Sequence, residues 1–220
     1  MSRAEEISAN LVAVERRIVA ACDTAARRRD EVLLVAVTKT FPATDVEHAI
    51  HAGALHVGEN KVQEARDKKP SVRGDARWHL IGHLQSNKAK DAVALFDVIQ
   101  SVDSLPLAEK IARAAEAIGK RQEVLLQVNV GGEAQKSGAA VSEVASLVRA
   151  VGALPSLHLT GLMTIPPVGD SRPYFRELKR MRDDLGLPEL SMGMTDDFEA
   201  AIEEGATIIR VGRAIFGARG

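Results

Sequence analysis

Residues 31–39 read EVLLVAVTK, and this stretch decides how the rest of the chain is interpreted. It is short and almost continuously apolar, which is typical of a parallel strand covered on both faces. The segment before it carries Ile7, Leu11, Val14 and Ile18 at helical spacing, so one face of a helix is apolar. The chain is therefore expected to open with a helix followed by a buried strand.

The same unit of a buried strand and a helix recurs along the chain. Several helical stretches end at a glycine, such as Gly53 and Gly205, which can adopt the left-handed conformation that closes a helix. No Gly/Ser-rich linker, charged block or low-complexity tract marks a second domain. The seven further strands are predicted at residues 54–58, 77–82, 96–102, 123–130, 157–165, 189–194 and 207–212.

Eight strands that alternate with helices predict an α/β protein of one domain, residues 1–220, folded as a (β/α)8 TIM barrel. Only a few residues follow the last strand, but a helix precedes the first one, so eight helices remain available. That arrangement favours a closed barrel with an N-terminal helix preceding strand one. A doubly wound open sheet is the alternative.

The composition indicates a globular protein without an unusual charge. Hydrophobic residues make up 45% and charged residues 27% of the 220 positions, and the net charge is -1. This charge creates no global field for nucleic acid or an anionic membrane, and 3% aromatic residues are too few for a base-stacking surface. The arginines at 27–29 are interpreted as solvated helix ends. We therefore expect no nucleic acid and no membrane among the partners.

Two further features indicate a cytoplasmic protein. The N-terminal segment does not resemble a signal peptide, because Glu15, Arg16 and Arg17 interrupt it, and no apolar run is long enough to span a bilayer. The single cysteine, Cys22, cannot form an internal disulfide. We expect it to pack inside a helix rather than to act as a nucleophile.

Polar residues gather where the predicted strands end. In a barrel of this kind, the carboxyl ends of the strands carry the functional site. The bodies of the strands are mostly apolar, so the clustering indicates a pocket, although each residue singly can be a solvated loop group. The residues at these ends are Lys39, Glu59, Asn60, His83, Ser101, Asp103, Asn129, Met163, Thr164, Met194, Thr195, Gly212 and Arg213.

Lys39 is the candidate for covalent chemistry. It ends the apolar run, so its side chain is expected to point into or over the mouth of the barrel. Partial burial lowers the pKa of a lysine, and the neutral amine can then attack an aldehyde. The alternative is a lysine whose amine reaches solvent from the end of a strand.

An anion site is predicted at the last two strand ends. Thr195 stands at the expected N-cap of the next helix, and Gly212 and Arg213 follow the last strand. Loops in these positions often bind phosphate through backbone N–H groups and a helix N-terminus. Asp196 and Asp197 count against this interpretation, because they can satisfy the dipole of that helix themselves.

Two other strand positions leave alternatives open. Arg210 lies in the last strand, where burial of an arginine is costly unless it meets an acceptor, so either a structural ion pair or a bound ligand is consistent with it. His79 and His83 alternate around the end of the third strand, but a metal site would need a third ligand. We predict no metal.

Eight sequence strings, in order and over nearly the whole chain, resemble one family. They are AVTKT, VGENKVQEA, WHLIGHLQSNK, QVNV, QKSG, GLMTIPP, LSMGMTDDFEAAI and RVGRAIFG. The family is that of the pyridoxal phosphate homeostasis proteins, and WHLIGHLQSNK and LSMGMTDDFEAAI are specific to it. The resemblance implies one barrel, like the barrel half of alanine racemase, that holds pyridoxal 5′-phosphate as a Schiff base.

The resemblance also implies a role for nine residues. Lys39 forms the Schiff base, and Arg210 faces the pyridine nitrogen. The phosphate is held by the Thr195 hydroxyl and by backbone N–H groups of Gly212 and Arg213. Many members have serine at position 195 and threonine at position 213, so this chain keeps the first hydroxyl and loses the second. The other pocket residues are Asn60, His83, Met163 and, close to the phosphate, Ser191.

The family resemblance favours a carrier without catalytic residues over an enzyme. An arginine stays protonated, so opposite the ring nitrogen it opposes protonation of the ring and makes it a poor electron sink. Racemases with this barrel use a tyrosine from a second domain, whereas the single Tyr174 lies in a helical segment and is expected to pack. The alternatives are a small amino-acid racemase and a Schiff-base aldolase. We expect a monomer, with pyridoxal-phosphate-dependent apo-enzymes as recipients.

Overall fold

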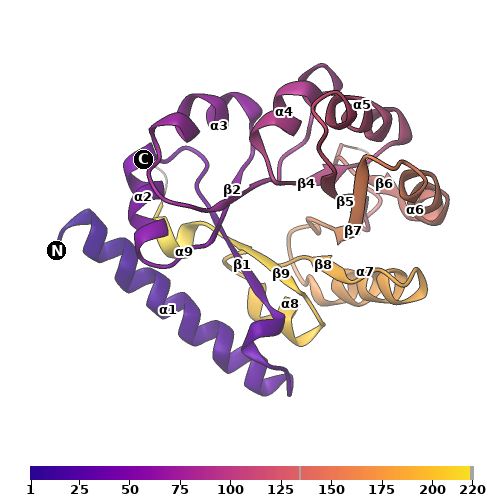
Figure 1. The fold of residues 1–220 in the computed structure, drawn as a ribbon. Helices are drawn as coiled ribbons and strands as arrows, with labels where there is room; N and C mark the ends of the chain where they lie inside the picture. The colour runs from indigo at the N-terminus through magenta and orange to yellow at the C-terminus, as the bar shows by residue number, and fades with distance from the viewer. Residues whose placement is uncertain (134, 219–220) are drawn as a thin grey trace.

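The computed structural model describes residues 1–133 and 135–218. Its centre is a ring of eight parallel strands in which each strand pairs with the next and the last pairs with the first (Figure 1). This closure confirms the predicted barrel, and the open sheet is wrong. The strands are β1 (Leu33–Val37), β2 (His56–Glu59), β3 (Arg77–Leu80), β4 (Val98–Val102), β5 (Gln122–Asn129), β7 (Leu157–Met163), β8 (Glu189–Ser191) and β9 (Ile208–Val211).

Helices form the outer layer around this ring (Figure 1). A two-residue strand, β6 (Ala139–Ala140), pairs with β5 outside the ring. None of the helices within the described residues is long and apolar enough to cross a membrane. The helices that follow the strands are α2 (Ala43–His51), α3 (Val62–Lys68), α4 (Ala89–Leu95), α5 (Leu105–Glu116), α6 (Val144–Gly152), α7 (Arg172–Asp184), α8 (Phe198–Glu203) and α9 (Arg213–Phe216).

The N-terminal helix, α1 (Arg3–Thr24), completes the outer layer. Ser2 and Glu5 cap its start, because each side chain accepts a hydrogen bond from the backbone N–H of the other. The helix packs against α2, α8 and α9, and so it covers the part of the ring that the four-residue α9 is too short to cover. Its buried residues include Ile7, Leu11, Val14, Ile18 and Cys22, as predicted.

The interior of the ring is partly apolar and partly polar. Side chains alternate between the two faces of a strand, so Ile208 and Arg210 of β9 both point inward. The apolar interior cluster consists of Val35, Val98, Leu125, Met163 and Ile208. The buried polar side chains that share the interior are His79, Gln100, Ser191 and Arg210.

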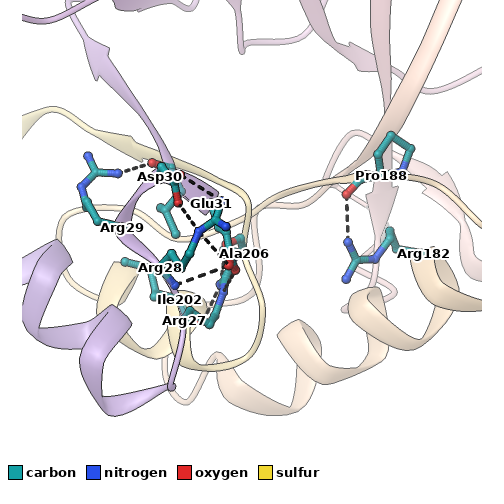
Figure 2. A network of polar contacts seen from close by, with 10 residues as sticks. Arg27, Arg28, Arg29, Asp30, Glu31, Arg182, Pro188, Ile202 and Ala206 are labelled. Carbon is teal, nitrogen blue, oxygen red and sulfur yellow. Dashed lines mark hydrogen bonds and ion pairs between the residues drawn. The ribbon is translucent and has the colours of Figure 1, made fainter.

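The arginines at 27–29 lie near the amino-terminal end of the barrel (Figure 2). Arg27 donates hydrogen bonds to the carbonyl oxygens of Ile202, in α8, and Ala206, at 2.9 and 2.8 Å. It therefore binds the last turn of a helix that is far away in sequence. The interpretation of all three arginines as solvated ends is wrong for Arg27, whose side chain is only 16% exposed.

Candidate functional site

A pocket of about 210 Å³ lies at the carboxyl ends of β1, β2, β8 and β9. Its walls include six of the nine residues to which the sequence assigned a ligand role, and the apolar lining comes from Val37, Ile81, Ile165 and Met194. Ring closure brings these loops together, because β9 pairs directly with β1. The six predicted residues are Lys39, Asn60, Thr195, Arg210, Gly212 and Arg213.

The other three predicted residues lie close to this pocket but do not line it. Met163 is fully buried in the apolar interior of the ring. Ser191 is also fully buried, and its hydroxyl contacts Arg210. His83 is exposed, with its Nδ1 3.6 Å from the Asp103 carboxylate. The strand ends alone did not distinguish lining residues from those behind or beside the pocket.

Lys39 lies in a tight turn that α3 holds from both sides. The neighbouring Thr40 has a φ of 69°, in the left-handed region that is costly for a threonine. Glu64 accepts a hydrogen bond from the Thr40 N–H at 3.3 Å, and the Lys68 ammonium donates to the Thr38 carbonyl at 2.8 Å. The two contacts on either side of Lys39 therefore fix the backbone from which its side chain reaches the pocket.

A buried ion pair lies directly beneath this turn. The Glu59 side chain is completely buried at the end of β2, and its Oε1 accepts hydrogen bonds from Lys68 at 2.5 Å and Thr38 at 2.7 Å. Burial raises the pKa of Glu59, although both donors oppose this effect. The ion pair thus joins the end of β1 to the end of β2 next to Lys39 and Asn60.

Sequence reasoning missed Glu64 and Lys68 as residues that shape the site. One signal was available, because they stand four residues apart on one helix and so share a face. Nothing in their spacing showed that this face turns toward the first loop.

Arg210 is buried with neutral hydrogen-bond acceptors. Its guanidinium donates to the Ser191 hydroxyl at 2.7 Å and to the Thr164 carbonyl at 2.8 Å. Burial lowers the pKa of Arg210 to about 10, so the group remains charged at neutral pH. Among the described residues no carboxylate forms an ion pair with it, which rules against the structural ion pair. A guanidinium carries five N–H donors, so donors remain for a ligand in the pocket.

The loop after β8 differs from its prediction. Strand β8 ends at Ser191, and α8 begins only at Phe198 with Asp197 as its N-cap. The assignment of Thr195 as the N-cap is therefore wrong, and the Asp197 carboxylate accepts a hydrogen bond from the Met194 N–H of the preceding loop at 2.7 Å. The left-handed Gly193, with a φ of 91°, turns the chain early and shifts the helix start. Thr195 instead lies in the loop, in the wall of the pocket.

Gly212 and Arg213 line the pocket from the end of β9, the neighbour of β8. A Cβ atom on Gly212 would lie 3.2 Å from the Val37 carbonyl oxygen, so glycine permits a close approach of β9 to β1. The exposed Arg213 side chain forms an ion pair with Asp196. Backbone N–H groups at a helix start lack partners within the helix, and Gly212 and Arg213 stand at the start of α9.

His79 does not offer a free metal ligand. One of its ring nitrogens lies 2.9 Å from Gln100 and the other 2.9 Å from His56. Across the described residues, no group of three His, Cys, Asp or Glu side chains is arranged to hold a metal ion.

Comparisons with known proteins assign the fold and the family. Residues 10–220 match the family described as alanine racemase, N-terminal domain. An alanine racemase of Clostridium difficile superposes with a TM-score of 0.76 over 98% of this chain and 57% of its own, at 14% identity, which shows the shared fold alone. The chain is thus a barrel of the alanine racemase N-terminal class.

Relatives of higher sequence identity identify the family within this class. The chain is 43% identical to the pyridoxal phosphate homeostasis protein of Pseudomonas aeruginosa, over 97% of this chain and 96% of the relative. PipY of Synechococcus elongatus, solved with PLP bound, is 35% identical with a TM-score of 0.85 over 96% of this chain and all of its own. This chain belongs to the family of pyridoxal phosphate homeostasis proteins, which confirms the resemblance seen in the sequence.

Proposed function

We propose that this protein binds pyridoxal 5′-phosphate on Lys39 and holds it in reserve, as part of vitamin B6 homeostasis. One observation carries the proposal: a single pocket joins a lysine, a buried guanidinium and a hydroxyl-bearing loop. These groups match three functional groups of the ligand, which are its aldehyde, its pyridine nitrogen and its phosphate. The bound cofactor in the PipY relative, at 35% identity, supports it.

Each residue has a distinct task in this proposal. The Lys39 Nζ forms a Schiff base with the aldehyde carbon, and one water molecule leaves. Arg210 donates to the pyridine nitrogen, and the Thr195 hydroxyl and the backbone N–H groups of Gly212 and Arg213 bind the phosphate. Asn60 lines the pocket beside Lys39. Among the residues outside the lining, Met163 is buried in the ring interior, Ser191 acts through Arg210, and the exposed His83 lies beside Asp103.

Titration of the purified protein tests the proposal. Pyridoxal phosphate should produce a visible absorption band, and borohydride should fix the cofactor to the peptide that contains Lys39. Absence of both the band and the reduced adduct under saturating cofactor would reject the proposed function.

Thr195→Val tests the phosphate end of the pocket. The substitution keeps the shape of the side chain and removes its hydroxyl. A hydrogen bond to a charged group contributes about 1.5–3 kcal/mol, so affinity for pyridoxal phosphate should fall by roughly ten- to hundredfold. Pyridoxal, which has no phosphate, should bind the parent weakly and the variant equally weakly. An equal loss for both ligands would place the phosphate elsewhere.

We further propose that the protein is a carrier rather than a catalyst. Bound pyridoxal phosphate supplies an electron sink to an attached amino acid when its ring nitrogen is protonated. Arg210 is charged and donates, so it opposes that protonation. The single tyrosine, Tyr174, lies on α7 outside the lining of the pocket. These features disfavour a racemase, and an aldolase would leave Arg210 without a role.

Exchange of the α-proton distinguishes carrier from racemase. We expect the parent protein, loaded with cofactor and saturated with alanine in heavy water, to exchange the α-proton of alanine for deuterium very slowly. Arg210→Glu places a carboxylate that can stabilise a protonated ring nitrogen, so exchange should rise, with Lys39→Ala as the inactive control. Proton NMR of alanine measures all three. Rapid exchange with inversion by the parent would establish the racemase instead.

The proposal includes the setting in which the carrier works. We propose a cytoplasmic monomer that passes the cofactor to pyridoxal-phosphate-dependent apo-enzymes. Lys39 is only partly buried at the mouth of the barrel, which supports access by a recipient from that side.

A further inference from the structure

A continuous series of hydrogen bonds crosses the interior of the barrel from the candidate pocket. Arg210 contacts the Ser191 hydroxyl at 2.7 Å, and that hydroxyl contacts the Gln100 side chain at 2.6 Å. Gln100 contacts Nδ1 of His79 at 2.9 Å, and Nε2 of His79 contacts Nδ1 of His56 at 2.9 Å. Five side chains from β9, β8, β4, β3 and β2 are thereby connected.

The arginine at one end determines the direction of every bond in the series. A guanidinium can only donate, so the Ser191 oxygen accepts from Arg210 and its single proton is donated to Oε1 of Gln100. The Gln100 amide therefore donates to Nδ1 of His79. Because burial lowers the pKa of His79 to about 3, the ring is neutral, carries its proton on Nε2 and donates to His56.

The series connects the two mouths of the barrel. Strands β4 and β8 are not neighbours in the ring, so the bond between Gln100 and Ser191 spans the interior. Arg210 lines the pocket at the carboxyl ends of the strands. His79 lines a separate cavity of about 720 Å³ near the amino ends, together with Arg77, Glu189 and Thr207.

We propose that Ser191, Gln100 and His79 are positioning residues that orient the Arg210 guanidinium toward the cofactor. The inference rests on the proposed function, because Arg210 matters as the partner of the pyridine nitrogen. Thr164 alone would hold the guanidinium at one atom and leave it free to rotate. The second anchor, Ser191, must present a lone pair to the guanidinium, and Gln100 fixes that orientation because it accepts the hydroxyl proton.

The direction of these hydrogen bonds can be tested in the unmodified protein without cofactor, because it determines which ring nitrogens of His79 and His56 carry a proton. Nitrogen-15 NMR should show His79 neutral, with its proton on Nε2, from pH 5 to 8. His56 should accept at Nδ1 and carry its own proton on Nε2. A proton on Nδ1 of His79 at neutral pH would mean that His79 donates to Gln100, opposite to the direction derived above. That result would overturn the proposal, whether or not the protein binds pyridoxal phosphate.

Gln100→Leu tests the effect on the pocket, with Gln122→Leu as a matched control. Gln122 is equally buried on the neighbouring β5, but within the described residues it donates to the carbonyls of Asp97 and Glu123 and forms no hydrogen bond with the series. Both variants should lose stability. Only Gln100→Leu should lower the affinity for pyridoxal phosphate, by about two- to tenfold, and shift the absorption band of the bound cofactor.

Gln100→Glu separates positioning from packing. The carboxylate can still accept from Ser191, so affinity should return toward that of the parent, but it has no proton for Nδ1 of His79. His79 should therefore move its proton to Nδ1, and NMR would detect the change. Equal effects of Gln100→Leu and Gln122→Leu on affinity and absorption would reject the proposal. A parent protein that fails to bind cofactor would reject the proposed function while the tautomer result still stands.

Discussion

Replacing Lys39 with alanine is expected to abolish covalent attachment of pyridoxal phosphate. The turn around Lys39 places its side chain in the wall of the pocket that Thr195 and Arg213 also line, and β1, which leads into this turn, pairs with β9, which leads to Arg213. Without the amine, no Schiff base can form at that position. Mass spectrometry after borohydride reduction should therefore show no adduct on the variant. Weak residual binding is expected, because the contacts proposed for the phosphate and the ring remain.

Lys61→Ala is the matched control for this experiment. Lys61 is an exposed lysine at the N-cap of α3, next to Asn60 of the pocket wall, and it forms an ion pair with Glu64 at 3.5 Å. Its removal should leave the reduced adduct at the parent level. A reducible adduct at full stoichiometry on the Lys39→Ala protein would show that another lysine carries the cofactor.

Replacing Lys68 with methionine is expected to cost about 3–5 kcal/mol of the free energy of unfolding at neutral pH, because a buried carboxylate then loses its partner. The Glu59 side chain is completely buried, and its Oε2 already lacks a hydrogen-bond partner among the described residues. The variant also loses the contact with the Thr38 carbonyl, so Lys39 should form less adduct. Urea unfolding and borohydride trapping measure the two effects.

The free energy of unfolding that Lys68→Met removes should increase with pH. Burial raises the pKa of Glu59 in the folded protein, and removal of the ammonium raises it further. The folded variant then binds a proton more tightly than the unfolded chain, so its stability falls as pH rises through the folded pKa. The deficit should be largest at pH 8 and should shrink as pH falls toward about 4.3, the ordinary glutamate value.

Two further variants check the cause of this loss. Adding Glu59→Gln to Lys68→Met removes the uncompensated charge and should recover much of the stability. Lys61→Met removes an exposed ion pair of the same helix and should cost only about 0.2–1 kcal/mol. A deficit that is independent of pH and unchanged in the double variant would mean that lost packing, rather than charge, explains the effect.

Much of the barrel is evident from the amino-acid sequence because strands that are covered on both faces need continuous apolar runs. All eight predicted strands overlap the strands of the ring, and α1 buries the face that its spacing predicted. Errors arose where local backbone geometry decides. The prediction for 189–194 extended past Ser191, and the turn at Gly193 moved the start of α8 beyond Thr195.

Part of the candidate site could also be predicted from the sequence. Polar residues at the ends of parallel strands converge whenever the sheet closes, which places Lys39, Asn60 and Thr195 around one pocket. The same rule could not exclude Met163, His83 or Ser191 from the lining. Whether a strand-end side chain faces the mouth, the interior or the rim depends on where each strand stops and on the neighbours that ring closure supplies.

The sequence by itself therefore determined the order of strands and helices and the family, and it singled out the lysine that we propose carries the cofactor, because these depend on residue type and local spacing. Only the tertiary structure decided how Lys39 and Arg210 are held. Glu64 and Lys68 reach the Lys39 turn from 24 and 30 residues away, and Gln100 reaches Ser191 across 91 residues. The first two contacts exist only once β1 and β2 have paired, and the third only once the ring has closed, since no local pattern encodes which side chains then meet.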